Sequence, residues 1–268
     1  MESLPAALDA AAAFRRLSAF SQKVARQSAT DVVAVRGGFA VLSPEFSASY
    51  EHNCLFITEP VPPAQLVSEA DRVLGGAGLE HRCLELALER VEPGWLREFA
   101  EQGYRIRRTL AMAVRGPSQR SPRAPVERVD YAQVRDLATA SWRRSLPQSS
   151  DEVIRQLVDR RRLTERACRV SHHLVRSAAG PVSRCELYLD PPTAQVESVE
   201  TEPEWQGRGF AAAVVLDAIA LARDSGCDLI FLYADADDWP QQLYRHLGFE
   251  AVGMTHTLER GPDLPVGQ

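Results

Sequence analysis

Residues Gln195–Ala211 read QVESVETEPEWQGRGFA. The first seven residues are typical of a strand, which Pro203 ends, and a turn that contains Gly207 and Gly209 follows directly. Behind the turn the apolar residues recur with helical spacing and predict a long amphipathic helix over Phe210–Ala222. The stretch therefore predicts a strand, a glycine-rich turn and a helix in immediate succession.

The glycine-rich turn has the features of an anion-binding site. Glycine permits positive φ, so successive backbone N–H groups can point into the same space. The amino end of the following helix adds partial positive charge. Gln206 and Arg208 contribute side-chain donors, and arginine can bind phosphate with two parallel hydrogen bonds. We expect a cradle for phosphate or pyrophosphate.

Two nucleotide-binding motifs compete for this turn. A P-loop requires Gly-Lys-Ser/Thr, and the turn contains no lysine. The spacing Gly207-x-Gly209-x-x-Ala212 fits a dinucleotide fingerprint, but that fold needs buried, almost continuously apolar parallel strands. The preceding strand carries Glu197 and Glu200, so a dinucleotide-binding oxidoreductase stays open only as a minor alternative.

A family resemblance supplies a third interpretation. Gln206–Ala211 resembles the Gln/Arg-x-x-Gly-x-Gly/Ala loop of the GNAT N-acetyltransferase superfamily, and Leu243–Phe249 is similar to its Leu-Tyr-x-x-x-Gly-Phe segment. The similarity extends over about Val126–Leu258. It implies an α/β (α+β) fold with a mixed, mostly antiparallel sheet flanked by helices. It also implies an acetyl-CoA-dependent N-acetyltransferase, in which a primary amine attacks the thioester directly within a ternary complex.

The resemblance implies roles for individual residues. The backbone of Val199 and Thr201 would pair with the pantetheine arm of acetyl-CoA, and Tyr244 would protonate the leaving thiolate. The pyrophosphate would be wrapped by the loop residues Gln206, Gly207, Arg208, Gly209, Phe210 and Ala211. The chain departs from the family at Asp237 and Pro240, where asparagine and alanine are usual. Asp237 lacks amide donors, which puts a cofactor contact through its side chain in doubt.

A base is also needed, because an amine is protonated at neutral pH and must lose a proton before it attacks. Glu197 and Glu200 lie on one predicted strand, and a period of two would place them on opposite faces. Glu200 is nearest the expected thioester position and is the predicted base. Glu202 is a weaker candidate, and a chain of water molecules remains an alternative.

The chain divides at a linker. Residues 116–125 lie in a stretch rich in proline and serine without hydrophobic periodicity, which separates units 1–115 and 126–268. Both units show a Thr-Glu-Pro stop, a helix, a strand, a helix and a last strand. We therefore expect two tandem GNAT-like domains. In the first domain, Val61-Pro62-Pro63 replaces the glycine loop, and proline has no N–H group to donate. This domain is therefore predicted not to bind acetyl-CoA. It is predicted instead to form one side of the acceptor site.

Composition narrows the class of protein. The 268 residues carry a net charge of −5, which disfavours a nucleic-acid binder. No apolar run reaches the roughly 20 residues of a membrane helix, and the N-terminus predicts a helix over Pro5–Leu17 rather than a signal peptide. Five scattered cysteines indicate a reducing, cytoplasmic location. No metal is expected, because His172 and His173 are adjacent on a strand and must point to opposite faces.

The acceptor is predicted from charge. Acidic residues gather near the proposed site and favour a cationic amine on a small molecule or peptide; they are Glu197, Glu200, Glu202, Asp235, Asp237 and Asp238. Trp142, Trp205 and Trp239 are candidate pocket residues, and Arg160–Arg162 is interpreted as a solvated face. The protein is expected to be a monomer or a homodimer. A non-catalytic acyl-CoA sensor is the main alternative to an enzyme.

Overall fold

The structure is a computed structural model that describes residues 9–88, 90–116, 118–178 and 180–262. Its helices are α1 (Ala10–Ser28), α2 (Pro63–Ala70), α3 (Pro93–Glu101), α4 (Tyr131–Ser145), α5 (Asp151–Asp159), α6 (Arg161–Ala167), α7 (Phe210–Asp224) and α8 (Pro240–His246), with short turns η1 (Pro44–Phe46), η2 (Tyr50–His52), η3 (Asp71–Gly75) and η4 (Pro203–Trp205). Its strands are β1 (Asp31–Val35), β2 (Gly38–Leu42), β3 (Cys54–Ile57), β4 (Arg82–Leu86), β5 (Arg105–Val114), β6 (Glu127–Val129), β7 (Arg169–Ser177), β8 (Gly180–Asp190), β9 (Thr193–Thr201), β10 (Leu229–Asp235) and β11 (Phe249–Arg260).

All strands of the described residues join in one sheet. The order across its 11 strands is β1-β2-β3-β4-β11-β5-β10-β9-β8-β7-β6. Only the pairs β3–β4 and β9–β10 run parallel among the described strands; every other neighbouring pair is antiparallel. The mixed, mostly antiparallel fold expected from the sequence is confirmed.

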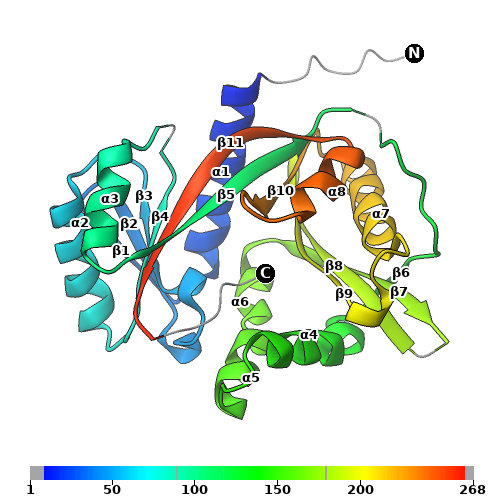
Figure 1. The fold of residues 1–268 in the computed structure, drawn as a ribbon, viewed down its shortest axis with the longest axis horizontal. Coiled ribbons are helices and arrows are strands. Elements are labelled where there is room, and N and C mark those ends of the chain that lie inside the picture. The colour runs from blue at the N-terminus through cyan, green and yellow to red at the C-terminus, as the bar shows by residue number, and fades with distance from the viewer. Residues whose placement is uncertain (1–8, 89, 117, 179, 263–268) are drawn as a thin grey trace.

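The two units exchange their last strands. The strand β5 ends the first unit but lies between β10 and β11, whereas β11 ends the second unit but lies between β4 and β5. The two strands pair with each other from Val114–Phe249 to Arg105–Glu259, and Figure 1 shows them side by side at the centre of the molecule. The predicted units 1–115 and 126–268 are therefore consecutive along the chain but interleaved in the sheet.

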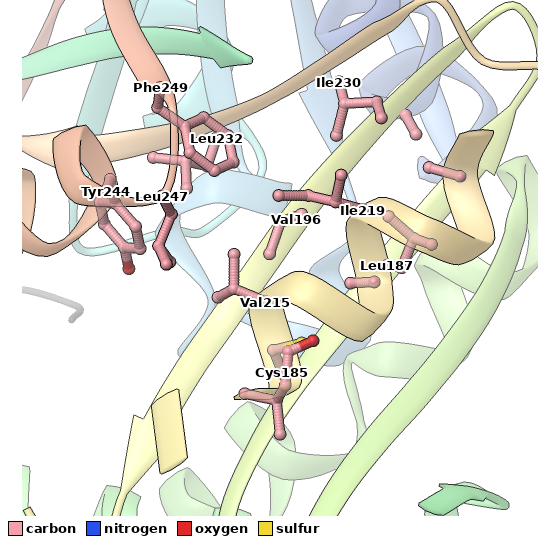
Figure 2. Close-up of a cluster of buried hydrophobic side chains, with 14 of the residues drawn as sticks. Cys185, Leu187, Val196, Val215, Ile219, Ile230, Leu232, Tyr244, Leu247 and Phe249 are labelled. Carbon is pink, nitrogen blue, oxygen red and sulfur yellow. The ribbon is translucent and has the colours of Figure 1, made fainter. Parts of the chain in front are cut away.

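Helices cover both faces of this shared sheet. On the second unit α7 packs its apolar stripe onto β8 and β9, where Val215 and Ile219 meet Cys185, Leu187 and Val196 (Figure 2). The stripe predicted from the sequence is the buried side of this helix, since Ala212–Val215, Ala218, Ile219 and Ala222 are all buried.

The opposite face is crossed by α1. Phe20 of this helix meets Phe231 of β10 edge-on, with ring centroids 5.5 Å apart. Asp9 caps the helix by accepting a hydrogen bond from Ala12 N at 2.7 Å. The helix begins at Ala10 and continues to Ser28, well beyond the predicted end at Leu17. The predicted start at Pro5 lies outside the described residues.

Candidate active site

An opening between two strands forms the centre of the site. β9 and β10 pair over only three residue pairs, from Thr193–Leu229 to Gln195–Phe231, and then diverge. In the first unit the corresponding strands β3 and β4 stay paired to their ends at Ile57 and Leu86, and Ala87 N extends the ladder to Ile57 O at 3.0 Å. A cavity of about 1300 Å³ extends from the divergent strands of the second unit across the sheet.

The glycine-rich loop closes one end of the cavity. Gly207 and Gly209 have φ of 73° and 84°, as their predicted role in the turn requires, and Gly209 is the N-cap of α7. Gln206 Nε2 donates to Thr201 O at 3.3 Å and ties the loop to the end of β9. The residues Gln206, Gly207, Gly209, Phe210 and Ala211 line the cavity.

Arg208 is arranged differently from its loop neighbours. Its guanidinium lies 4.5 Å from the centre of the Trp205 ring, and its Nη2 donates to Glu204 O at 3.3 Å. These contacts turn the side chain along the outside of the loop. The first N–H groups of α7 have no acceptor within the helix, so they can serve as donors at this end of the cavity.

Tyr244 reaches the cavity from the other side of the opening. It lies on α8, is 8% exposed, and packs edge-on against Phe249 (Figure 2). Burial raises the pKa of its phenol, and the nearby charge of Glu197 raises it further. The hydroxyl therefore keeps its proton at neutral pH. Val199 and Thr201 of β9 line the same cavity.

The departures noted at the start of α8 have structural partners. Pro240 occupies the first turn of α8, as its fixed φ allows. Asp237 is bound by Arg108 of β5, with Nε and Oδ2 3.3 Å apart. A side chain from the first unit therefore engages the residue that lacks the amide usual in the family.

A β-bulge lies in the middle of the site. Ser198 has a φ of 51°, rare for a residue with a side chain. Glu186 pairs with Glu197 and Arg184 with Glu200, so Ser198 and Val199 together oppose a single residue of β8. Because directly opposed residues share a face, the bulge places both glutamates on the same face of the sheet. The prediction that they point to opposite faces is wrong, because period-two alternation fails across an inserted residue.

Arginines pair with most of the carboxylates on this face. Arg184 Nε donates to Glu200 Oε2 at 3.0 Å, and its Nη1 donates to Glu186 Oε1 at 2.9 Å. Glu186 also forms an ion pair with Arg161. Farther out, Glu202 pairs with Arg144, with Nη1 and Oε2 2.9 Å apart. The prediction that Arg160–Arg162 is a solvated face is wrong for Arg160 and Arg161, which line the cavity, and confirmed for Arg162, which is exposed.

Glu197 has different partners. It accepts from Gln195 Nε2 at 2.8 Å and from Ser198 N at 3.2 Å, both neutral donors. Burial raises the pKa of its carboxyl group, and the negative charge of Glu51 adds to the shift. Of the carboxylates described on this face, Glu197 is the one best suited to take up a proton.

The structure also locates the tryptophans and histidines named from the sequence. Trp142, Trp205 and Trp239 all line it. His172 and His173 lie on opposite faces as predicted: His172 packs beside Tyr131, while His173 Nδ1 lies 2.7 Å from Asp217 Oδ2 of α7.

The described residues contain no group of three or more His, Cys, Asp or Glu side chains placed to hold a metal ion. None of the described helices is long and apolar enough to cross a membrane.

The sequence did not predict that a glutamate of the first unit lines the cavity. Glu51 of η2 belongs to the first unit and lines the cavity beside residues of the second. No local motif surrounds it in the sequence. Only the packing of the two units reveals that it reaches the site.

Comparison with known proteins gives a family match over part of the chain. Residues 131–249 match the model of the acetyltransferase (GNAT) family. Mycothiol acetyltransferase of Thermobifida fusca is 40% identical over 60 residues, which are 22% of this chain and 19% of that protein. The uncharacterized N-acetyltransferase CgeE of Bacillus subtilis is 28% identical over 80 residues, 29% of this chain and 31% of that protein. The matches thus span a fifth to a third of these relatives' length.

Solved structures share the whole fold. A GCN5-related N-acetyltransferase from Kribbella flavida superposes with a TM-score of 0.62 at 19% identity, covering 94% of this chain and 96% of that chain. A tandem GNAT protein from the clavulanic acid biosynthesis pathway superposes with a TM-score of 0.53 at 13% identity, covering 78% of this chain and 76% of that chain. At these identities the likeness concerns the fold, and it includes a chain with two GNAT units.

Proposed function

Because the chain belongs, through residues 131–249, to the GNAT acetyltransferase family, we propose that it transfers an acetyl group from acetyl-CoA to a primary amine. The amine attacks the thioester directly while both substrates are bound. The observation that carries the proposal is the divergence of β9 from β10, which opens directly onto the glycine loop. The family relationship alone would not distinguish an active unit from a degenerate one.

The residues fit acetyl-CoA as a substrate. The free edge of β9 at Val199 and Thr201 offers backbone groups to the pantetheine amides, as an added strand would. The pyrophosphate would lie against the N–H groups of the loop and of α7, which are oriented by the positive φ of Gly207 and Gly209. A backbone N–H at the bulge near Val199 would meet the thioester carbonyl and stabilise developing negative charge there.

The reaction then needs one proton acceptor and one proton donor. We assign the acceptor role to Glu197, which takes the proton of the ammonium group. The freed nitrogen forms a bond to the carbonyl carbon, the carbon–sulfur bond breaks, and Tyr244 gives its proton to the leaving thiolate. The new amide nitrogen gives up its second surplus proton to the Tyr244 phenolate, which restores the phenol. Glu200, the base predicted from the sequence, would have to give up its ion pair with Arg184 in order to be protonated. We therefore rank Glu200 second.

A non-catalytic acyl-CoA sensor would keep the loop but would not need Tyr244 beside a raised-pKa carboxyl group. Those two groups favour the enzyme. The dinucleotide-binding alternative is disfavoured, because the sheet is mostly antiparallel rather than doubly wound and parallel.

Calorimetric titration with acetyl-CoA tests the proposal. Gly207→Trp fills the cradle, and Gly78→Trp is a matched control, because both glycines have nearly the same φ (73° and 76°) and open space where a side chain would begin. We expect one-site binding to the wild type and to Gly78→Trp, none to Gly207→Trp, and none of NADH to any of them. A thiol-release assay with a panel of primary amines then separates the enzyme from the sensor. Absence of acetyl-CoA binding to the wild type would overturn both.

A further inference from the structure

A segment of the first unit docks on the helices of the second. It comprises residues 44–52, with the turns η1 and η2. Ala48 at its centre is buried among the side chains of Leu146, Ile154, Leu157 and Val158. Its backbone N–H donates to Gln156 Oε1 of α5 at 3.0 Å. This segment therefore has a fixed position on the second unit, close to the amino end of α6.

Glu51 stands near the end of this docked segment. Its Oε1 lies 3.1 Å from Arg160 Nη1 and 3.4 Å from His52 Nδ1. The same Arg160 Nη1 donates to Ser49 Oγ at 3.1 Å, and its guanidinium lies over the Trp142 ring. Contacts with Glu51, Ser49 and Trp142 thus fix the position of the Arg160 side chain, and Arg160 in turn fixes the Glu51 carboxylate.

The Glu51 carboxylate remains available to a ligand. Its side chain is 60% exposed, and the residue lines the cavity. An ion pair with one arginine leaves part of the carboxylate's hydrogen-bonding capacity unused, since a carboxylate has about four acceptor positions.

One carboxylate on this side of the cavity has no arginine partner. Glu51, Glu186 and Glu200 form ion pairs with Arg160, Arg161 and Arg184, whereas Glu197 accepts hydrogen bonds from neutral donors only. The negative charge of Glu51 acts on Glu197 and on Tyr188 next to it. A carboxylate without a cationic partner beside the negative charge of Glu51 therefore favours a cationic group at this place.

We propose that Glu51 is an acceptor-binding residue supplied by the first unit, and that together with Glu197 it selects amines that carry a positive charge at neutral pH. The inference rests on the proposed function, because it concerns the second substrate of the same site. It explains why a unit without a glycine loop contributes to catalysis: it completes the acceptor half of the site and leaves the acetyl-CoA half to the second unit.

Glu51→Gln, with Glu45→Gln as a matched control, tests the acceptor role. Glu45 lies on the same docked segment but is exposed, where Thr30 Oγ1 donates to it at 2.8 Å. With benzylamine, which is protonated at neutral pH, we expect KM to rise about tenfold in Glu51→Gln, the size of one charge-assisted contact. We expect kcat to stay within about twofold by the same contact argument, and the Kd of acetyl-CoA to stay unchanged. With aniline, which is neutral, KM should not change. Equal KM values for benzylamine in Glu51→Gln and Glu45→Gln would overturn the proposal.

A second measurement does not depend on an active acceptor. The Glu197 carboxyl carbon can be titrated by NMR, with Glu197→Gln to assign its signal. The charged or titratable groups around it are Glu51, Arg160, Arg184, Glu186, Tyr188, Tyr233 and Tyr244 from other elements and Glu200 on its own strand. Removing the charge of Glu51 should lower the pKa of Glu197, and an unchanged titration would refute the proposed pairing. Failure of the wild type to bind acetyl-CoA would instead reject the proposed function. Failure of the Glu51 proposal and failure of the proposed function therefore give different results.

Discussion

Arg184 and Glu200 lie directly opposite each other on β8 and β9, and Arg184 Nε donates to Glu200 Oε2 at 3.0 Å. This pairing exists only because the bulge at Ser198 inserts one residue into β9. The arginine neutralises the glutamate nearest the end of the strand. The glutamate on the other side of the bulge, Glu197, keeps neutral donors only and carries the raised pKa.

The two glutamates should therefore differ in their effect on turnover. We expect Glu197→Gln to lower kcat/KM about 100-fold, the lower end of the range for loss of a general base. Glu200→Gln should act less, and mainly through the position of Arg184. A larger loss in Glu200→Gln than in Glu197→Gln would reverse the assignment of the base.

The pH dependence of kcat/KM provides an independent check on Glu197. A base must be deprotonated to act, so activity falls as pH drops through its pKa. Because the pKa of Glu197 is raised, this acid limb should lie above that of an ordinary glutamate. The limb should disappear in Glu197→Gln and persist in Glu200→Gln, as measured between pH 4 and pH 9 with a saturating concentration of acetyl-CoA.

Tyr244→Phe should lower kcat about 100-fold without weakening acetyl-CoA binding, since it removes a proton donor and little packing. Tyr104→Phe is the matched control. Tyr104 is a buried tyrosine of the first unit that follows α3, packs against Phe99, and has a pKa raised to about 12 by burial. Steady-state kinetics and calorimetry on both variants check this. An equal effect of the two substitutions would indicate a structural role for Tyr244.

Local patterns predicted many of the elements well. The sequence predicts a strand over Arg105–Val114 and a helix over Tyr131–Ser145, and β5 and α4 have these bounds. It also predicts Ser150 as a helix cap, and Ser150 caps α5 by accepting from Val153 N. The glycine loop was predictable for the same reason, because its chemistry depends on a few consecutive residues. Each of these features is decided within about one helical turn or one strand.

Features decided by contacts between distant residues were not predictable. The bulge at Ser198 depends on the register of β8, which no property of Gln195–Thr201 alone indicates. The sequence predicts one helix over Ser150–Arg166, but the structure breaks it at Arg160, whose guanidinium contacts Glu51 and Ser49, more than 100 residues earlier in the chain. Glu51 was missed for the same reason.

His81 should make stability depend on pH. It is 2% exposed, its Nε2 lies 3.0 Å from Asn53 O, and burial lowers its pKa to about 4. The unfolded chain binds a proton near pH 6.5 and the folded chain does not, so stability is lost as pH falls from about 6.5 toward 4. The total is about 3 kcal/mol for a shift of this size. Urea unfolding at pH 7 and pH 4.5 should show a smaller loss in His81→Phe than in wild type. His246→Phe, at an exposed site, should leave the wild-type dependence intact.

Gly253 should tolerate no side chain. It follows the irregularity at which β11 shifts register against β5, and a Cβ there would lie 2.1 Å from Phe14 Cδ2 of α1. Gly253→Ala should lower the free energy of unfolding by about 2 kcal/mol, as overpacking of a core does. Gly94→Ala, where a Cβ would meet nothing within 4 Å, is the control. Phe14→Leu in the same chain should recover part of the loss, and the absence of any recovery would place the cause elsewhere.

The exchanged strands should make the two units depend on each other. Without β11, β4 and β5 of the first unit have no strand between them, and without β5, the same holds for β10 and β11 of the second. Each fragment would expose unpaired backbone groups along two strands, which destabilises the fragment and promotes association. Fragments 1–115 and 126–268 should therefore not unfold cooperatively as separate monomers. Mixed, they should elute together from a sizing column and regain one cooperative urea transition. A monomeric 126–268 fragment with the full transition of the intact chain would show that the second unit folds without its borrowed strand.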